Sequence, residues 1–385
     1  MRALIVGGGI GGVTTAMAMR KAGIDATVFE RAADIRHVQV GSGIDVWPNG
    51  INVLRQINPE VVDRLRERSA VTTHMTFMDW RSRNVLVDFP VGEWSARAGG
   101  WTLGVRRGDL HDSLASGLED GVLELGRNLT SFVQDAEGVI ARFGDGSEER
   151  GDVLVGADGF GSTVRGQLLG ESKPRYSGHA IWQGYTDLEH ELAPNGRFPL
   201  YVGRGRRFVF LHVDADTICW IGIANDAEGT TVDDVKGSCL ERFSGWAAPT
   251  AELIESTPPE GILHLDVYDR EPVKRWSEGR VTLLGDAAHP MTFDAGQGAM
   301  QAIEDGLALT RALERHDDVP SALRAYEAGR VPRTTELVKM ARMVGTIFDW
   351  ENPVVCALRN WILLRGVFAR VMPRQQRKLI SHTID

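Results

Sequence analysis

Residues 2–12 read Arg-Ala-Leu-Ile-Val-Gly-Gly-Gly-Ile-Gly-Gly, an apolar run followed by a glycine-rich turn. Residues 2–6 suit a buried strand, and residues 10–22, rich in Ala and Met, suit a helix that ends before Gly23. A second buried strand follows at residues 26–30. A strand, a glycine-rich turn, a helix and another strand predict the beginning of a dinucleotide-binding α/β domain.

The glycines fit the G-x-G-x-x-G fingerprint with Gly7, Gly9 and Gly12, and Gly11 lies within it. The first permits a tight turn, the second lets a pyrophosphate approach, and the third lets helix and strand pack closely. Glu30 ends the second strand, where its carboxylate can accept hydrogen bonds from an adenosine ribose. Its negative charge disfavours the 2′-phosphate of NADP at this site.

Two further stretches combine a buried strand, a glycine-containing turn and a helix. The first runs from Asp152 to Arg165 and contains Ala157-Asp158-Gly159. The second is Gly285-Asp-Ala-Ala-His-Pro-Met-Thr-Phe-Asp-Ala-Gly-Gln-Gly298, between an apolar run at 281–284 and a long helical pattern. This layout aims a helix N-terminus and its free N–H groups at an anion. An αβ turn that happens to be rich in glycine is the alternative.

The remaining sequence predicts a sheet-rich unit. Residues 71–90 and 176–270 alternate in the manner of strands, and the second block favours an antiparallel sheet with a helical stretch at 232–246. The chain then returns to the buried strand at 281–284, so this block is predicted to be inserted into the dinucleotide-binding domain. The other predicted elements are a loop and helix at 34–60, a helix at 107–118, strands at 122–134 and 138–143, and C-terminal helices at 299–345 and 352–370.

The chain has 385 residues, 43% hydrophobic and 25% charged, as in soluble globular proteins. Its net charge of −9 disfavours a nucleic-acid surface and favours small-molecule partners. Cys219, Cys239 and Cys356 lie far apart, which predicts core residues in a reducing compartment and no metal site. No apolar stretch approaches the roughly 18 to 20 residues of a membrane span, and the N-terminus suits a strand better than a signal peptide. We therefore expect a cytoplasmic protein.

Three separated blocks together resemble the fingerprints of single-component, flavin-dependent aromatic hydroxylases with the para-hydroxybenzoate hydroxylase fold. Arg107 looks like that family's flavin-contacting arginine. Val46-Trp-Pro-Asn-Gly50 and the chain length resemble the urate and salicylate hydroxylase branch, with zeaxanthin epoxidase as a cousin. The blocks, which span nearly the whole chain, are Gly7–Gly12 with Glu30, Ala157–Gly159 continuing to Arg165, and Gly285–Gly298.

The resemblance implies an α/β fold. We expect a Rossmann-like FAD-binding domain with an inserted substrate domain, built on a mixed or antiparallel sheet, and C-terminal helices. The expected bounds are 1–70, 100–175 and 271–330 for the FAD-binding domain, 71–99 and 176–270 for the substrate-binding domain, and 331–385 for the C-terminal helices.

The resemblance also implies a reaction. Non-covalently bound FAD, reduced by NADH or NADPH, would react with O₂ to a flavin C4a-hydroperoxide that hydroxylates an aromatic or heteroaromatic small molecule. Two alternatives stay open: epoxidation of an alkene or isoprenoid substrate, and an FAD-binding module that does not oxygenate. We expect a monomer or homodimer without nucleic acid and without stable membrane association.

Roles for individual residues follow from the resemblance. Asp286 would hydrogen-bond the ribityl chain, and residues 296–298 would present backbone and a helix N-terminus to the N1–C2 edge of the flavin. Asp158 resembles a motif residue associated with both FAD and the nicotinamide. The full set of expected cofactor contacts is Gly7, Gly9, Gly11, Gly12, Glu30, Arg31, Gly43, Arg107, Asp158, Asp286, Gly296, Gln297 and Gly298.

Phe293 and Asp294 depart from the family, which has Pro and Asn at these places in its third motif. Phe293 suits either a wall beside the flavin or simple loop packing. Asp294 is a candidate catalytic residue, because urate-type hydroxylases also carry an aspartate there. It could orient a substrate N–H or O–H or remove its proton. Capping of the helix that begins near residue 299 is the alternative.

Arg207 is the second candidate catalytic residue, because it resembles the substrate-anchoring arginine of the urate enzyme. Arg204 and Arg206 lie close by, so a solvated basic turn is the alternative. A set of residues in the sheet-rich block suits either an aromatic pocket or, as we prefer, the sheet core. The set is Tyr201, Phe210, His212, Trp182 and Trp220.

Three other features carry a structural prediction only. His289 is expected to be a hydrogen-bonded structural residue, and Arg165 to pack a helix or orient Asp158. The basic stretch from Arg365 to Lys378 suits a membrane-surface helix or, preferably because it is short and contains a proline, a docked terminal helix.

Overall fold

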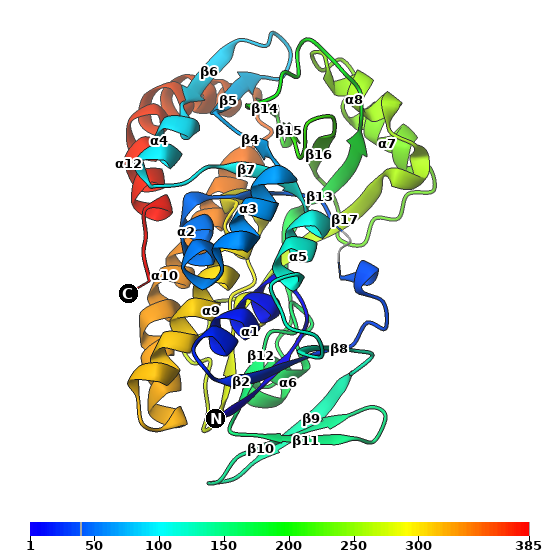
Figure 1. Cartoon of the computed structure of the whole chain (residues 1–385). Helices are drawn as coiled ribbons and strands as arrows, with labels where there is room; N and C mark the ends of the chain where they lie inside the picture. The colour runs from blue at the N-terminus through cyan, green and yellow to red at the C-terminus, as the bar shows by residue number, and fades with distance from the viewer. Residues whose placement is uncertain (39–40, 385) are drawn as a thin grey trace.

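A five-stranded parallel sheet forms the lower part of the molecule in Figure 1, a computed structural model that describes residues 1–38 and 41–384. Its strand order is β18-β12-β1-β2-β8, and every neighbouring pair is parallel. This arrangement confirms the predicted α/β class. The strands are β1 (Arg2–Val6), β2 (Asp25–Glu30), β8 (Leu123–Leu125), β12 (Val153–Gly156) and β18 (Val281–Leu283).

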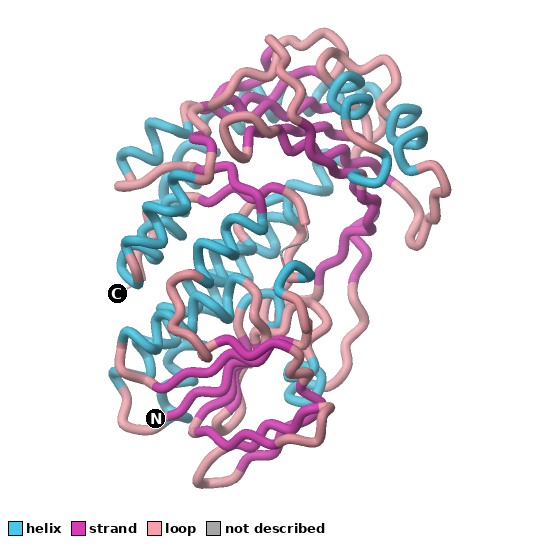
Figure 2. The backbone as a smooth tube through the Cα atoms, turned by 45° about the vertical axis from the view of Figure 1, so that its right-hand side comes forward, coloured by secondary structure: helices cyan, strands magenta, loops and turns pink. Residues whose placement is uncertain are grey.

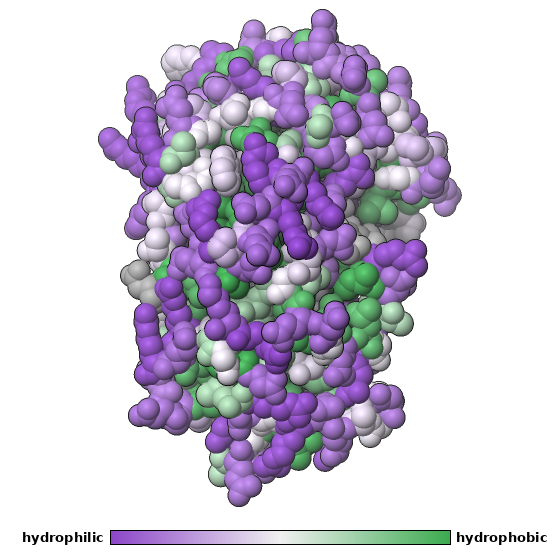
Figure 3. Space-filling model, in the orientation of Figure 1, coloured by the Kyte–Doolittle hydropathy of each residue, from purple (hydrophilic) through white to green (hydrophobic). Residues whose placement is uncertain are grey.

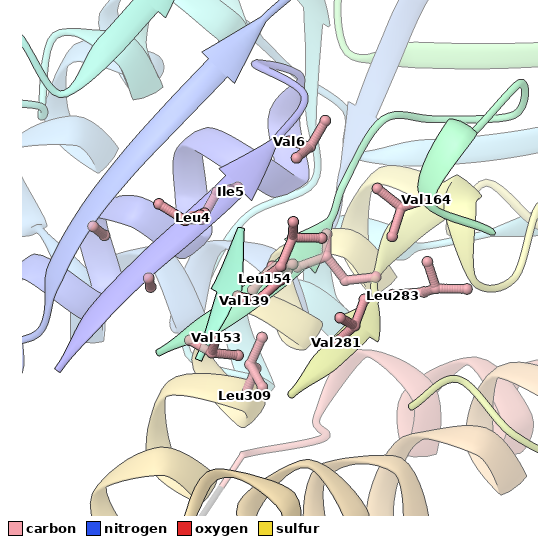
Figure 4. Packing of buried hydrophobic residues seen from close by; sticks show 14 of the residues in the cluster. Leu4, Ile5, Val6, Val139, Val153, Leu154, Val164, Val281, Leu283 and Leu309 are labelled. Atoms are coloured by element: carbon pink, nitrogen blue, oxygen red, sulfur yellow. The ribbon is translucent and has the colours of Figure 1, made fainter. Parts of the chain in front are cut away.

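Helices cover this parallel sheet. Figure 4 shows Leu4 of β1, Leu154 of β12 and Leu283 of β18 in one apolar cluster with Leu309 of a covering helix. Full burial of each such side chain contributes roughly 1.5–3 kcal/mol. The helices that surround the sheet are α1 (Ile10–Lys21), α5 (Arg107–Ala115), α6 (Thr163–Leu169), α9 (Gly298–Arg315) and α10 (Val319–Phe348).

A small antiparallel sheet lies below the parallel one. It consists of β9 (Leu129–Gln134), β10 (Val139–Phe143) and β11 (Glu148–Gly151). The sequence did not predict β11, because its residues are charged and three of its four side chains are at least partly exposed. The strand forms by pairing with β10 across the turn.

A seven-stranded mixed sheet forms the upper part of Figure 1, in the order β17-β13-β16-β15-β14-β5-β6. The first five strands are antiparallel, as predicted, whereas β14 pairs with β5 in parallel. Segments 71–90 and 176–270 therefore share one sheet. The strands are β5 (His74–Asp79), β6 (Val85–Phe89), β13 (Arg175–Thr186), β14 (Arg197–Val202), β15 (Arg206–His212), β16 (Ile218–Asn225) and β17 (Leu263–Asp269).

Two helices cover the outer face of the mixed sheet. They are α7 (Val235–Arg242) and α8 (Thr250–Ser256), whose apolar side chains join the aromatic residues of β13, β15 and β16 in one core. The single helix predicted at 232–246 is shorter than expected, and α8 was not predicted. A short 3-10 turn, η2 (Pro259–Gly261), leads from α8 into β17.

Several short elements connect the two large sheets. The segment expected to be a loop and helix at 34–60 also contains a strand, β3 (Gly43–Val46), because it pairs with β7 (Leu103–Arg106). The remaining connecting elements are β4 (Ala70–Val71), η1 (Ile35–His37), α2 (Pro48–Ile57), α3 (Pro59–Glu67) and α4 (Val91–Arg97).

The C-terminal helices dock on the mixed sheet beside β5, β6 and α4, as Figures 1 and 2 show. They are α11 (Pro353–Leu358), the π-helix η5 (Arg359–Phe368) and α12 (Ala369–Ile380). A docked terminal helix is confirmed, but α12 continues through Pro373 to Ile380 instead of ending near residue 370. Within the described residues, no helix combines the length and apolar character needed to cross a bilayer. The face in Figure 3 is largely hydrophilic, with scattered apolar patches.

A buried charge network joins α9 to α10. Arg330 donates to Asp305 and to Glu304 at 2.6 Å each, and all three side chains are almost fully buried. Burial alone would raise the pKa of Asp305, but Arg330 and His289 outweigh it and lower that pKa to about 2. The paired charges therefore stay ionised inside the protein.

We expect Arg330→Met to reduce the free energy of unfolding by about 3–5 kcal/mol, because it removes the buried cation shared by two buried carboxylates and leaves Glu304 with Arg333 and Asp305 with His289. Arg324→Met, on the exposed side of the same helix, should change it by less than about 0.5 kcal/mol. Denaturant titration at pH 7 measures both.

The same network predicts a pH dependence. Because the Asp305 pKa is lowered in the folded state, its contribution to stability is present above pH 4 and is lost towards pH 2. The native and Arg330→Met curves should therefore converge in acid, and equal stabilities at pH 7 would contradict the network.

Candidate active site

A cavity of about 920 Å³ lies between the parallel sheet and the mixed sheet. Its lining includes the glycine-rich turn after β1, residues 291–299 and the inner face of the mixed sheet. Segments far apart in the chain therefore meet around one space. Of the predicted site residues, those that line it are Gly9, Gly11, Gly43, Arg107, Arg207, Asp286, Asp294, Gly296, Gln297 and Gly298.

The fingerprint glycines have different surroundings. A Cβ on Gly7, whose φ is +108°, would lie 2.3 Å from the Ala157 carbonyl oxygen, and one on Gly12 would lie 1.9 Å from the Gly7 carbonyl oxygen. A Cβ on Gly11 would lie 2.7 Å from Leu284. A Cβ on Gly9 would meet nothing within 4 Å and would enter the cavity. Three glycines thus serve packing, and the fourth leaves backbone open to a ligand.

Glu30 and Arg31 follow one another at the end of β2 but differ in environment. Glu30 is buried, and its carboxylate accepts hydrogen bonds from the backbone N–H of Gly8 at 2.7 Å and of Ala32 at 2.8 Å. Arg31 is exposed and lies outside the cavity lining. The carboxylate therefore holds the glycine-rich turn in place.

The stretch after β18 begins with η3 (Gly285–Ala287). Asp305 accepts hydrogen bonds from the Gly285 N–H at 3.0 Å and from His289 at 2.6 Å. The prediction of a hydrogen-bonded structural histidine is therefore confirmed. Asp286 is the exposed residue among 281–290, and it lines the cavity.

The same stretch ends at the N-terminus of α9. Gly296 adopts the left-handed conformation with φ +59°, which reverses the chain after η4 (Phe293–Ala295). The side-chain oxygen of Gln297 accepts from Asn49 at 3.1 Å. Gly298 opens the helix, and a Cβ there would meet nothing within 4 Å. An 18-residue helix thus presents its first N–H groups to the cavity, an arrangement that favours an anionic group.

Asp158 and Arg165 support this loop from behind. Asp158 accepts from the Ser162 hydroxyl at 2.5 Å, and its neighbours Ala157 and Gly159, rather than Asp158 itself, line the cavity. Arg165 donates to the carbonyl oxygens of residues 287 and 288 at 2.8 and 3.1 Å. It therefore holds the loop after β18, a role that differs from the predicted orientation of Asp158.

The opposite wall contains β3. Position 43 requires glycine, because a Cβ there would lie 2.8 Å from the Val213 side chain and 3.0 Å from the Cys219 side chain. Asp45 also lines the cavity, and one of its carboxylate oxygens is buried with no hydrogen-bond partner. Burial raises its pKa to about 7. The sequence did not single out Asp45, although a carboxylate between Ile44 and Val46 in a strand is an unusual choice.

Arg207 and Asp294 form a buried ion pair. Arg207, on β15, donates to the carboxylate of Asp294 in η4, and its guanidinium carbon lies 5.3 Å from the ring centre of Phe348. Arg207 is 3% exposed, so a solvated basic turn does not describe it, whereas its neighbour Arg206 is exposed. Asp294 does not cap α9, because the residue that precedes the helix is Gln297.

The Asp294 side chain is fully enclosed, so this residue lines the cavity with its backbone. Its second oxygen would lie 3.1 Å from a Cβ on Gly345, so α10 passes directly over it. Burial alone would raise the pKa of Asp294, but Arg207 and His179 outweigh it and lower that pKa. The carboxylate is therefore ionised at neutral pH.

Two further residues belong to this cluster and were missed by the sequence analysis. Asp349, at the end of α10, lies 3.5 Å from Arg207 and 3.4 Å from His179. His179, on β13, is 1% exposed and its ring lies 6.0 Å from that of Phe293. No local pattern marks either residue, since their elements come together only in the folded chain.

The aromatic residues for which a pocket and the sheet core were both considered belong to the sheet core, which was the preferred prediction. Trp182, Tyr201, Phe210 and Trp220 are at most 1% exposed and pack on the outer face of the mixed sheet. His212 Nε2 donates to the Ala193 carbonyl oxygen at 2.8 Å. The three cysteines are buried, as predicted. The cavity is lined instead by the alternate residues of the same strands.

Sequence and structure comparisons place the chain among known proteins. The family described as FAD binding domain matches residues 1–178 and 246–341. The chain belongs to this family. The aurachin C monooxygenase/isomerase of Stigmatella aurantiaca is 37% identical over 378 residues, covering 98% of this chain and 97% of that protein. The FAD-dependent urate hydroxylase of Klebsiella pneumoniae is 33% identical over 350 residues, covering 89% of each chain.

A solved structure agrees with these relatives. Klebsiella pneumoniae HpxO complexed with FAD and uric acid is 30% identical, has a TM-score of 0.93 and covers 100% of this chain and 98% of that chain. Family membership and these relatives confirm the predicted FAD cofactor and the predicted monooxygenase class. The expectation of an enzyme rather than a non-oxygenating module is confirmed with them. The residues present fit FAD, because Gly9 and Gly298 open onto the cavity without side chains and α9 directs its free N–H groups there.

We expect Gly9→Ala to weaken FAD binding by at least about tenfold, or ~1.4 kcal/mol, because its methyl group enters the cavity. Its φ of −73° accommodates alanine, so the melting temperature of the apoprotein should stay unchanged. Gly12→Ala places a methyl group against backbone and should prevent folding instead. Flavin absorbance per chain and thermal unfolding separate the two effects. Equal FAD content in native protein and Gly9→Ala would contradict the assignment.

Proposed function

We propose that this FAD-dependent monooxygenase hydroxylates an aromatic or heteroaromatic ring with one polar edge, using NADH or NADPH and O₂. The observation that carries the proposal is the composition of the cavity wall opposite the glycine-rich turn. Within the described part of the mixed sheet, Arg207 is the cationic residue of a cavity wall that is otherwise apolar except for Asp266 and Tyr268 on the edge strand β17. The apolar residues on that face are Ile181, Phe198, Leu200, Val209, Leu211, Ile221, Ile223, Leu265 and Val267.

This wall favours one polar contact over many. A ring with hydrogen-bonding groups on every edge would leave several of them unpaired against aliphatic side chains. Each buried, unpaired polar group costs about 1–3 kcal/mol. A ring with a carbonyl, phenolate or carboxylate on one edge can direct that edge to Arg207 and leave its remaining carbons on the apolar face. A purine such as urate therefore fits this wall less well than a largely hydrocarbon ring.

Asp294 acts through Arg207 in this proposal. An ionised carboxylate whose pKa is lowered is a poor proton acceptor, and its enclosure by Gly345 and Arg207 keeps it from the ring. It is well suited to fix the guanidinium, because a charge-assisted pair orients Arg207 before substrate arrives. We therefore favour an anchor over a base, with Asp294 as a positioning residue and Arg207 as the substrate contact.

The chain's own residues supply position and environment for the reaction. Bound FAD supplies the redox chemistry that accepts electrons from NADH or NADPH and activates O₂. Asp286 and the N-terminus of α9 are arranged to hold the cofactor at one side of the cavity, with Asp286 pointing into it. The aliphatic residues of the mixed sheet exclude water from the other side, where the substrate ring would lie. The cytoplasmic location, the monomeric or dimeric state and the domain bounds remain predictions.

The direct test uses purified, FAD-loaded protein and a panel of phenolic acids, quinolines and purines. Rings with one polar edge should stimulate NADH or NADPH oxidation and yield a product that carries one oxygen atom from ¹⁸O₂. NMR of the product then shows where this oxygen atom is attached, which distinguishes a ring hydroxyl from an epoxide. Stronger stimulation by purines than by all other compounds would contradict the single-edge proposal.

We expect Arg207→Gln to raise KM by roughly 10- to 100-fold, because a charge-assisted hydrogen bond contributes about 1.5–3 kcal/mol. Asp294→Asn should have the same effect, and adding it to Arg207→Gln should raise KM little further if it acts through that residue. Arg206→Gln, exposed on the same strand, is the matched control. Substrate kinetics across pH 6–9 give the measurement. Should Asp294→Asn lower kcat in a pH-dependent way in the Arg207→Gln background, Asp294 would be a base.

A further inference from the structure

The cavity extends beyond Arg207 into an apolar arm between the mixed sheet and the C-terminal helices. One wall comes from β5, β6 and α4, and the other from the end of α10, η5 and α12. The residues of the apolar arm are Met75, Phe77, Phe89, Val91, Trp94, Val344, Ile347, Phe348, Leu363, Val367, Phe368, Val371 and Met372. None of these residues carries a charge, and the neighbouring polar lining is Gln375 and Gln376.

The arm begins directly at the proposed substrate contact. Phe348 lies under the Arg207 guanidinium at 5.3 Å, and its ring stacks on that of Phe77 at 6.0 Å. Phe77 in turn meets Phe368 edge to face at 6.4 Å. A row of aromatic rings therefore leads away from Arg207. Atoms attached to a ring whose polar edge meets Arg207 would next encounter this row.

The far end of the arm reaches the protein surface. Met343, Val367 and Val371 line the cavity and are 55%, 46% and 42% exposed, respectively. Large apolar residues that are exposed together and continue a cavity are typical of a ligand-binding groove. The arm is thus open at the end opposite Arg207, so that a ligand longer than one ring can extend along it.

The wall formed by η5 is locally unusual. Residues 359–368 are wound as a π-helix, a rare conformation that is frequent at functional sites. Arg359, which begins it, is 1% exposed and donates to the Gly203 carbonyl at 2.6 Å. The wall is therefore fixed to the mixed sheet at one end, while Leu363, Val367 and Phe368 face the cavity.

The side chains of the arm suit a flexible hydrocarbon. Met75 and Met372 have unbranched, adaptable side chains that fit ligands of varied shape. Apart from the Trp94 indole N–H, the side chains of the arm offer no strong donor or acceptor, and Gln375 and Gln376 lie beside it. A sugar, peptide or nucleotide extension would lose hydrogen bonds to water on burial there. A linear alkyl or isoprenoid chain loses none, and each buried CH₂ raises affinity roughly fourfold.

We propose that the substrate is amphiphilic, with its ring at Arg207 and a flexible hydrocarbon chain bound in the apolar arm. This inference rests on the proposed function, because it takes the polar edge of the ring to lie at Arg207. It goes further by assigning the C-terminal helices to substrate binding. Chain length then becomes the main determinant of affinity, and the ring determines where oxygen is inserted.

The test uses FAD-loaded, full-length protein with two series of probes, 4-alkylphenols and 2-alkyl-4-hydroxyquinolines, from methyl to nonyl. Dissociation constants come from the change in flavin absorbance, which does not depend on turnover. In the native protein we expect affinity to rise at least 100-fold from the methyl to the heptyl compound in a series whose ring is accepted. Geranyl-bearing members of each series distinguish a branched isoprenoid chain from a linear alkyl chain.

Two tryptophan variants on the same π-helix localise the chain. Val367→Trp fills the arm, whereas Ile362→Trp adds the same bulk at a residue that is equally exposed, 46%, and lies outside the cavity lining. We expect Val367→Trp to weaken binding of the heptyl compound at least tenfold more than binding of the methyl compound. Ile362→Trp should leave both dissociation constants unchanged.

The outcomes separate the two proposals. A dissociation constant that does not depend on chain length, or equal effects of both variants, would overturn the apolar arm as a chain site even if the rings are hydroxylated. Binding that depends on chain length without stimulated NADH oxidation or ¹⁸O incorporation would support the arm and overturn the proposed reaction on these rings. A lack of binding by every member of both series would overturn the amphiphilic substrate.

Discussion

The buried contact between Arg330 and the acidic pair Glu304 and Asp305 is the interaction on which the cofactor side of the molecule depends. Asp305 binds the first backbone N–H of the loop after β18 as well as His289 within that loop. Glu304 accepts from Asn49 at 2.7 Å, and Asn49 also donates to Gln297. The two ends of the loop at 285–298 are therefore tied to one charge cluster. One buried hydrogen-bond network therefore positions the loop, the helix and the segment after β3, because moving any of them leaves a buried polar group without a partner.

The two large sheets contribute opposite properties to the cavity between them. The parallel sheet ends in backbone groups, a helix N-terminus and glycines that leave room for a charged, extended cofactor. The mixed sheet contributes mainly apolar side chains and one cation, Arg207, which is held by Asp294 and Asp349. Most groups that can form hydrogen bonds to a ligand lie on the cofactor side, and few lie on the substrate side.

The sequence predicts those features whose cause lies in neighbouring residues, and it does not predict contacts between segments that are far apart in the chain. The turn at Gly7–Gly12 was predictable because its glycines serve the adjacent strand and helix. Arg207 and Asp294 were both named, but 87 residues separate them, and nothing in either segment shows that they meet. Asp349 and His179 were missed for the same reason. Strand β11 and helix α8 were missed because they are short, and their partners rather than their own patterns define them.

The parallel sheet has an order of strands that bears on how the protein is made. Its outermost strand, β18, pairs with β12, yet about 125 residues of the mixed sheet and its helices lie between them in the chain. On the ribosome, synthesis proceeds at about 5–20 residues per second, so β12 waits roughly 6–25 seconds for its neighbour. Arg330 emerges later still. The parallel sheet is therefore completed only after all strands of the mixed sheet have been synthesised, so the mixed sheet has time to assemble before the flavin site is complete.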